Sequence, residues 1–305
     1  MGLKKSKFPL RINKNNILIF LALSLPILSW GSAFPSIRVA LGGYSPVQIA
    51  LIRFLTGSSM LVIYGLYRKM GLPDRRDLPM IFFLAITGIA LYHIPLNMGS
   101  RTINAGTVSL LNATAPVFTA ILSMLLIRER LQLKGWIGIG TSFTGAALLA
   151  LNGGNGVSIA FGALWVLFAA FSESFYFIYQ KGLVKKYGPV NLTTYVFMAG
   201  TLIMLPFSQG LVSAAKQAPV EATVAAIYMG IFPTAIAYVL WAYDMSLFPA
   251  SRVASLLYLS PVISIIIGWI WLKEIPNLFM LIGGTLAIAG VSIVQSSRIK
   301  TRKKK

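Results

Sequence analysis

Long apolar segments without charged residues dominate this chain of 305 residues. Stretches that lack Asp, Glu, Lys, Arg and His cover 15–37, 102–127, 135–172, 187–215, 222–243, 253–272 and 275–297. A helix that crosses the hydrocarbon core of a bilayer needs about 20 apolar residues. Inside a bilayer the backbone must satisfy its own hydrogen bonds, and the sequence lacks the short alternating segments of a transmembrane barrel. The pattern therefore predicts an all-α integral membrane protein.

Helix-breaking residues divide these apolar segments into ten expected transmembrane helices. Gly42-Gly43, Gly188-Pro189 and the Gly-rich run 152–156 are examples of the breaks between them. The ten expected helices cover 16–37, 46–67, 78–99, 104–127, 134–151, 159–180, 190–213, 222–243, 251–272 and 277–296.

The second half of the chain repeats the first. Residues 105–150 align without a gap on 250–295 with eleven identities, and Pro116 falls on Pro261. Each repeat holds five helices, and an odd number turns the second repeat upside down. Inverted repeats of this kind are typical of secondary transporters, which bind substrate between the two repeats. The expected organisation is a basic tail at 1–15, a first repeat at 16–151, an extracytoplasmic linker at 152–158, a second repeat at 159–296 and a basic tail at 297–305.

Composition and charge agree with lipid as the solvent. Charged residues make up 11% of the chain, against about 25% in soluble domains. Of the 27 Lys and Arg residues, 22 fall in the tails and in the loops on the side of the N-terminus, and 4 in the opposite loops. Because Lys and Arg favour the cytoplasmic side, this bias predicts a plasma-membrane protein with both termini in the cytoplasm. It also assigns the net charge of +20 to membrane topology and not to nucleic-acid binding.

The polar residue types limit the chemistry further. The chain has no Cys and a single His, so we expect neither a metal site nor a cofactor. A lipid-modifying membrane enzyme would need clustered acids or histidines at one membrane face. A channel would need rings of charge or a filter, and a sensor would need a soluble domain. A secondary transporter fits best, with these other classes as alternatives.

Short motifs inside the expected helices resemble the EamA-type branch of the drug/metabolite transporter superfamily. The matching segments are Trp30 to Phe34, Leu51 to Phe54, Ala105 to Leu111, Ala115 to Val117, Glu129, Pro261-Val262 and Glu274. The resemblance covers about 16–296. It implies two five-helix repeats, and it implies export of amino acids or related small metabolites.

Two charged residues inside expected helices are candidates for coupling or charge pairing. Glu173 is the only carboxylate well inside a helix. A carboxyl group in a dry environment favours its neutral form, so Glu173 could carry a proton, which makes a proton the candidate coupling ion. It could also pair with a substrate ammonium or serve only as a structural hydrogen-bonding group. Arg53 could grip a substrate carboxylate, or it could tie helix ends together.

Polar and aromatic residues within other helices are the candidate substrate-binding set. They are Trp30, Ser32, His93, Asn97, Asn112, Tyr176, Tyr238 and Tyr258. For His93 and Asn97 an interhelical hydrogen bond is the alternative to cavity lining. For Asn112 and Tyr258, which flank the repeat-related prolines, the alternative is a helix kink alone. Pro116 and Pro261 are expected to kink their helices beside this set. Small residues four apart, from Gly138 in one repeat and Gly283 in the other, predict a tight packing seam or, alternatively, the face of a homodimer.

Overall fold

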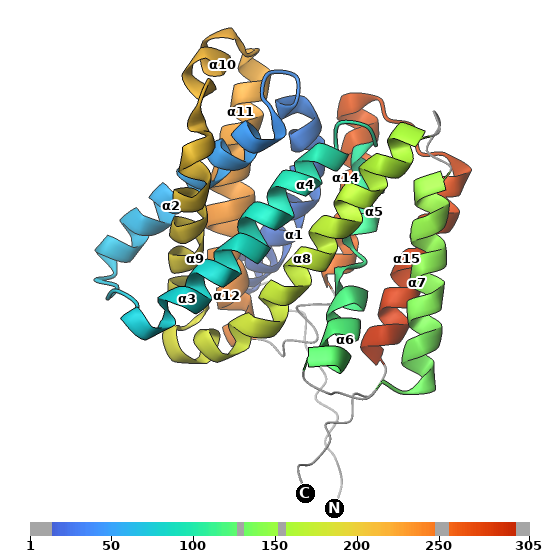
Figure 1. The fold of residues 1–305 in the computed structure, drawn as a ribbon, viewed down its shortest axis with the longest axis horizontal. Helices are drawn as coiled ribbons and strands as arrows, with labels where there is room; N and C mark the ends of the chain where they lie inside the picture. Colours follow the sequence, from blue (N-terminus) through green and yellow to red (C-terminus); the bar gives the residue numbers. More distant parts are fainter. Residues whose placement is uncertain (1–13, 127–130, 152–156, 248–255, 297–305) are drawn as a thin grey trace, which may run out of the picture.

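The computed structural model describes residues 14–126, 131–151, 157–247 and 256–296. These residues form helices joined by short turns, with no strand among them (Figure 1). The longer helices are α1 (Lys14–Ala40), α2 (Pro46–Tyr67), α3 (Leu78–Ala85), α4 (Leu91–Gly99), α5 (Ala105–Asn112), α6 (Ala115–Leu126), α7 (Leu133–Leu151), α8 (Val157–Tyr187), α9 (Pro189–Met204), α11 (Val220–Met229), α12 (Ala237–Leu247), α14 (Leu259–Leu272) and α15 (Leu278–Ser296). Short elements are η1 (Arg75–Asp77), η2 (Ile86–Ala90), η3 (Leu205–Ser208), α10 (Leu211–Gln217), η4 (Gly230–Ile236) and η5 (Leu256–Tyr258).

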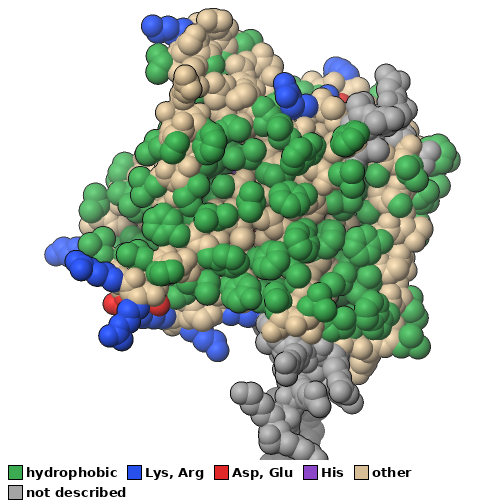
Figure 2. Space-filling view, in the orientation of Figure 1, with side chains coloured by type: hydrophobic (Ala, Val, Ile, Leu, Met, Phe, Trp, Pro, Cys, Tyr) green, Lys and Arg blue, Asp and Glu red, His purple; other side chains and the backbone are tan. Residues whose placement is uncertain are grey.

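Helices of the bundle have the length and the apolar surface of membrane-spanning segments. Seven helical segments of the described chain are long and apolar enough to cross a membrane, and Leu256–Leu272 is a shorter apolar helix. Figure 2 shows hydrophobic side chains covering the middle of the visible face, with Lys and Arg gathered at its two ends. Such a band matches the hydrocarbon core, and the charged ends match the two interfaces. The protein is therefore a multi-pass membrane protein.

Several helix ends differ from the expected ones. Helix α8 continues to Tyr187, past the predicted end at 180. The helix expected over 190–213 ends at Met204, and a 3-10 turn follows. The reason is local: Pro206 lacks a backbone donor, and Gly210 adopts a left-handed conformation (φ +75°) that starts the separate helix α10. The first part of the helix expected over 251–272 lies outside the described residues.

Breaks inside the spans fall near the prolines. Ala113 and Thr114 interrupt the span between α5 and α6, and the break ends two residues before Pro116. Pro261 lies in the first turn of α14, which follows the 3-10 turn η5. Two further breaks were not expected: the segments η2 and η4 are π-helical. A π-helical turn leaves backbone carbonyls without their usual partners, so other groups can bind them.

Helices α7 and α15 pack antiparallel at one edge of the bundle (Figure 1). A Cβ atom at Gly145 would lie 2.5 Å from the Gly283 carbonyl oxygen, and one at Gly290 would lie 2.6 Å from the Gly138 carbonyl oxygen. The early part of each helix thus meets the late part of the other. The predicted packing seam is present, and its small residues are occupied within the chain. A homodimer would therefore have to use another surface.

Contacts between the two halves of the chain come in matching pairs. Gly57 of α2 packs against Thr234 of η4 so closely that a Cβ atom at Gly57 would lie 2.5 Å from the Thr234 Cγ2. Gly200 of α9 packs in the same way against Ile89 of η2, where a Cβ atom would lie 2.7 Å from the Ile89 Cγ2. The two contacts are related by the repeat, because the two glycines are 143 positions apart in sequence and Ile89 and Thr234 are 145 positions apart. Glycine is needed at both positions because any side chain would push the span away from the π-helical segment.

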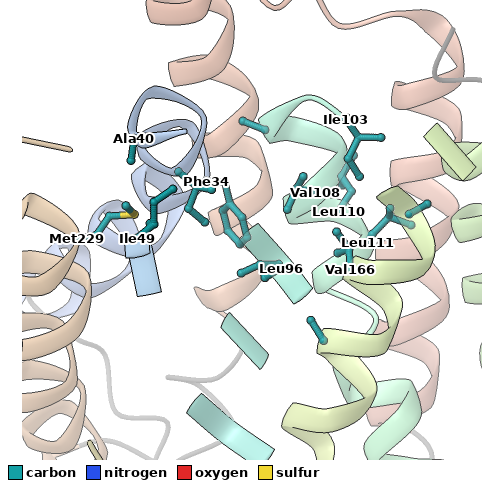
Figure 3. Packing of buried hydrophobic residues seen from close by; sticks show 14 of the residues in the cluster. Phe34, Ala40, Ile49, Leu96, Ile103, Val108, Leu110, Leu111, Val166 and Met229 are labelled. Carbon is teal, nitrogen blue, oxygen red and sulfur yellow. The ribbon is translucent and has the colours of Figure 1, made fainter. Parts of the chain in front are cut away.

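A buried apolar cluster holds the centre of the bundle. Figure 3 shows its side chains from α1, α2, α4, α5, α8 and α11 packed against one another, among them Phe34, Leu96, Val108, Leu111 and Val166. In a membrane, packing of this kind and not the hydrophobic effect holds helices together.

Polar contacts fasten the two ends of the bundle. At one end the Arg38 Nε donates to the Glu274 carboxylate (3.0 Å), which also accepts from the Ala105 backbone N–H (2.8 Å). At the other end the Lys186 ammonium pairs with Asp77 at 2.6 Å and with Asp74. Both clusters join segments that are distant in sequence.

Candidate functional site

Arg53 is the centre of a buried polar cluster. Helix α2 begins at the Ser45 capping box, with Pro46 in its first turn, and runs inward to Arg53, whose residue surface is 6% exposed. The Arg53 Nε donates a 2.8 Å hydrogen bond to the Thr234 hydroxyl oxygen. The guanidinium also lies 5.9 Å from the centre of the Phe54 ring. Close packing at Gly57 brings Thr234 within reach of the arginine.

Glu173 supplies the opposite charge. It lies on α8, is half-buried, and makes no hydrogen bond or ion pair within the described part of the chain. Its carboxylate and the Arg53 guanidinium are close enough to interact electrostatically, but not in direct contact. Two opposite charges therefore face each other without forming a salt bridge.

His93 stands beside Arg53, enclosed by two rings. Its imidazole lies 4.7 Å from the Phe54 ring and 4.4 Å from the Tyr92 ring, both edge to face. The His93 Nδ1 is buried and has no hydrogen-bond partner among the residues that the structure describes. The Tyr92 hydroxyl accepts a 3.1 Å hydrogen bond from the Asn112 side-chain amide. The Asn112 side-chain oxygen is buried and has no partner in the described part of the chain.

Aromatic side chains surround the charges. The Tyr238 ring packs edge to face against Trp30 (5.4 Å) and Phe197 (5.0 Å). Tyr176 is 8% exposed, and its ring lies against Gly88 of η2. Tyr176 and Tyr238 both lie within electrostatic range of Glu173. An aromatic wall around separated charges can bind the apolar part of a small ligand as well as its charged ends.

The structure brings most, but not all, of the predicted residues together. Trp30, Arg53, His93, Asn112, Glu173, Tyr176 and Tyr238 belong to this cluster through the contacts described above. Asn97 is buried and donates to the Pro46 carbonyl (2.9 Å), which ties α4 to the start of α2. The Ser32 hydroxyl pairs with the Tyr228 hydroxyl at 2.6 Å. Tyr258 packs beside the separate apolar cluster around Val117.

The sequence prediction did not include two buried polar residues. Thr234 holds Arg53, and only its position next to Pro233 in an apolar span could have marked it. Asp244 of α12 is 1% exposed, and among the described residues neither of its carboxylate oxygens has a hydrogen-bond partner. Contrary to the sequence prediction, Glu173 is therefore not the only carboxylate inside a helix: α12 continues past the apolar stretch 222–243 and includes Asp244.

The described residues bring no group of three or more His, Cys, Asp or Glu side chains together. The cluster offers a guanidinium, a carboxylate, hydroxyl groups and aromatic rings. These groups suit the non-covalent binding of a small polar organic molecule. A polar cavity of about 250 Å³ lies at the end of the bundle where Arg38 meets Glu274.

Known proteins with similar sequences are named as transporters. The chain is 41% identical over 280 residues to "Uncharacterized transporter YdfC" of Bacillus subtilis, a match that covers 92% of each chain. It is 35% identical over 282 residues to "Probable terminal-alkyne amino-acid exporter" of Streptantibioticus cattleyicolor, covering 92% of this chain and 95% of the relative.

A solved crystal structure shares the fold, with a TM-score of 0.61 and 18% identity, covering 91% of this chain and 97% of the other. The names of the relatives point to transport and away from catalysis. The profile of the EamA-like transporter family matches twice, over residues 17–151 and 160–296, and the chain therefore belongs to the EamA-like transporter family.

Proposed function

We propose that this protein is a secondary transporter that exports amino acids or related small organic metabolites by alternating access of two inverted repeats. The observation that carries the proposal is the unpaired charge couple at the centre of the bundle. Arg53 lies in the first family match and Glu173 in the second. Charges inside a membrane are costly and are retained where they bind or move something.

The proposed architecture has ten spans. Helices α1 and α7 join the seven long spans and the shorter apolar helix that ends at Leu272. The double family match, the antiparallel packing of α7 on α15 and the paired glycine contacts support two inverted five-helix repeats. The site would then lie between the repeats, where rocking of one repeat against the other exposes it to each side in turn.

The substrate class rests on the chemistry of the cluster and on one relative. A guanidinium and a carboxylate that do not neutralise each other are complementary to a molecule with both an acidic and a basic group. One relative is named as an exporter of an amino acid. We place the protein in the plasma membrane with both termini in the cytoplasm, on the charge bias of the loops.

Glu173 is the proposed coupling residue. A half-buried carboxyl group without a hydrogen-bond partner can take up a proton on one side of the membrane and release it on the other. If Glu173 instead holds a substrate ammonium, it is required for every mode of transport. The two roles can be separated by experiment.

The test uses purified protein in liposomes loaded with a radiolabelled mixture of amino acids. We expect wild type to show both exchange and transport driven by a pH gradient. Glu173→Gln should lose gradient-driven transport and keep exchange. Glu221→Gln is the matched control, because Glu221 is an exposed acid in the first turn of α11.

Each outcome assigns a role. Loss of both activities in Glu173→Gln would make Glu173 a substrate partner and not a proton carrier. Gradient-driven transport at the wild-type rate would remove Glu173 from the mechanism. A wild-type protein that moves no amino acid would refute the proposed substrate class.

A further inference from the structure

We infer that Thr234 is a positioning residue that aims the Arg53 guanidinium, and that the end of this guanidinium is the subsite for a carboxylate of the ligand. The inference rests on the proposed function and adds to it a defined anchor for one chemical group. The inference rests on one observation: the Arg53 Nε donates a hydrogen bond, whereas within the described residues the two terminal nitrogens of the guanidinium do not.

Only one edge of Arg53 is occupied. The Nε donates to Thr234, and the side chain makes no other hydrogen bond within the described part of the chain. The two terminal nitrogens remain, and their planar fork matches the two oxygens of a carboxylate. A buried guanidinium with vacant donors carries a large desolvation cost, which a bound anion would offset.

Arg38, which has a structural role, makes more hydrogen bonds than Arg53 among the described residues. Its Nε donates to Glu274, and its Nη1 donates to the Ser100 carbonyl at 2.8 Å. Arg38 thus joins three segments through both ends of its guanidinium. Arg53 is more buried than Arg38 and yet binds a single hydroxyl group, so fastening helices does not account for its remaining donors.

Thr234 itself is held from two sides. It is completely buried in η4, and its methyl group packs on Gly57 of α2. The neighbouring Pro233 carbonyl accepts a 2.8 Å hydrogen bond from the Trp30 indole N–H. Because α1 thereby fixes the π-helical segment, the Thr234 hydroxyl has a defined place. The Nε bond then fixes the plane of the guanidinium and the direction of its fork.

The position of Glu173 sets the orientation of the ligand. The carboxylate of Glu173 interacts with Arg53 through space but leaves the fork unoccupied. A ligand carboxylate on Arg53 would leave its cationic group on the side of Glu173. Recognition should therefore depend on the ligand carboxylate and on the angle at which Arg53 presents its donors.

The experiment compares amino acids with their methyl esters, which keep the ammonium and lack the carboxylate. Binding to purified protein in detergent is measured by calorimetry for each pair. We expect wild type to bind at least one acid with an affinity about tenfold or more above that of its ester. Thr234→Val should lower the affinity for the acid about tenfold and leave the ester unchanged. Thr234→Ser keeps the hydroxyl and should restore the affinity for the acid.

Thr201→Val is the matched control. Thr201 also makes a buried hydroxyl contact with α2, to Ser58 at 3.1 Å, one turn from Arg53. Its loss should leave the preference for acid over ester unchanged. If Thr234→Val does not fold, Thr234→Ala tests the positioning role in its place, and Arg53→Lys tests the carboxylate subsite, because it keeps the charge and loses the fork. It should reduce the preference to below about threefold.

The outcomes separate this inference from the proposed function. Equal affinity of wild type for acids and esters, with transport of both, would overturn the carboxylate subsite and leave the transporter intact. An undiminished preference in Thr234→Val would overturn the positioning role of Thr234. A wild-type protein that neither binds nor transports any member of either series would refute the proposed substrate class and the subsite together.

Discussion

The antiparallel contact of α7 and α15 allows a quantitative prediction. A methyl group at Gly145 would lie 2.5 Å from the Gly283 carbonyl oxygen and 2.9 Å from the Ala287 Cα. Ordinary contacts begin near 3.4 Å, so the two backbones would have to separate by about 1 Å. Neither atom belongs to a flexible side chain that could move aside. The strain must therefore be relieved by moving a helix.

The size of the effect follows from two opposing terms. Overpacking of a tight contact costs about 1–3 kcal/mol. Alanine gains about 1 kcal/mol over glycine within a helix. Gly145→Ala should therefore destabilise the protein by up to about 2 kcal/mol. Gly140→Ala on the same helix meets no atom within 4 Å and should be neutral or stabilising by up to about 1 kcal/mol.

The assay is the free energy of unfolding of purified protein, measured by denaturant titration in detergent micelles. Gly290→Ala makes the equivalent contact, 2.6 Å from the Gly138 carbonyl oxygen, and should resemble Gly145→Ala. The double variant should cost less than the sum of the two changes, because one separation relieves both contacts. If Gly145→Ala is as stable as Gly140→Ala, the packing described for this seam is wrong.

Three further predictions concern the ends of the bundle. A cysteine at Gln217 should react with an impermeant thiol reagent added outside intact cells and one at Lys185 should not; the opposite labelling would reverse the proposed orientation. Glu274→Gln weakens the bond to Arg38 and should cost about 1–2 kcal/mol of stability, lowering the melting temperature; an unchanged melting temperature would show that this ion pair is screened by solvent. Ser45→Ala removes the capping box of α2 and should cost about 1 kcal/mol in the same measurement, unless water replaces the cap.

The hydrophobic pattern of the sequence predicts most of the helices of the fold. Long uncharged stretches mark helices whatever their tertiary contacts, because lipid leaves the backbone no other partner. Ends were predicted less well where a local conformation decides them. Gly210 turns the chain at a place where composition alone continues a helix, and α8 continues where Lys181 suggested a loop.

The site was predictable in its charges and less so in its geometry. Arg53 and Glu173 stand out because ionisable residues in apolar spans are rare. Thr234 looks like any other threonine in a helix, and its importance arises only when α2 packs against η4. Asn97 had the polarity expected of a cavity residue, but its amide is used by a backbone carbonyl. The sequence shows that a polar side chain in an apolar span needs a hydrogen-bond partner, but only the tertiary structure shows which group is that partner.

Because α8 is long, a small tilt of the helix moves its two ends by several ångströms. Its 31 residues span about 46 Å, whereas the hydrocarbon core is about 30 Å thick. A tilt of about 10° around its midpoint would displace each end by about 4 Å, more than a hydrogen bond can stretch. At its C-terminal end the Tyr187 hydroxyl accepts from the Asp74 backbone N–H at 3.0 Å, and Lys186 pairs with Asp77. A tilt of α8 must therefore either break these contacts of Tyr187 and Lys186 or move the segment before α3 together with α8.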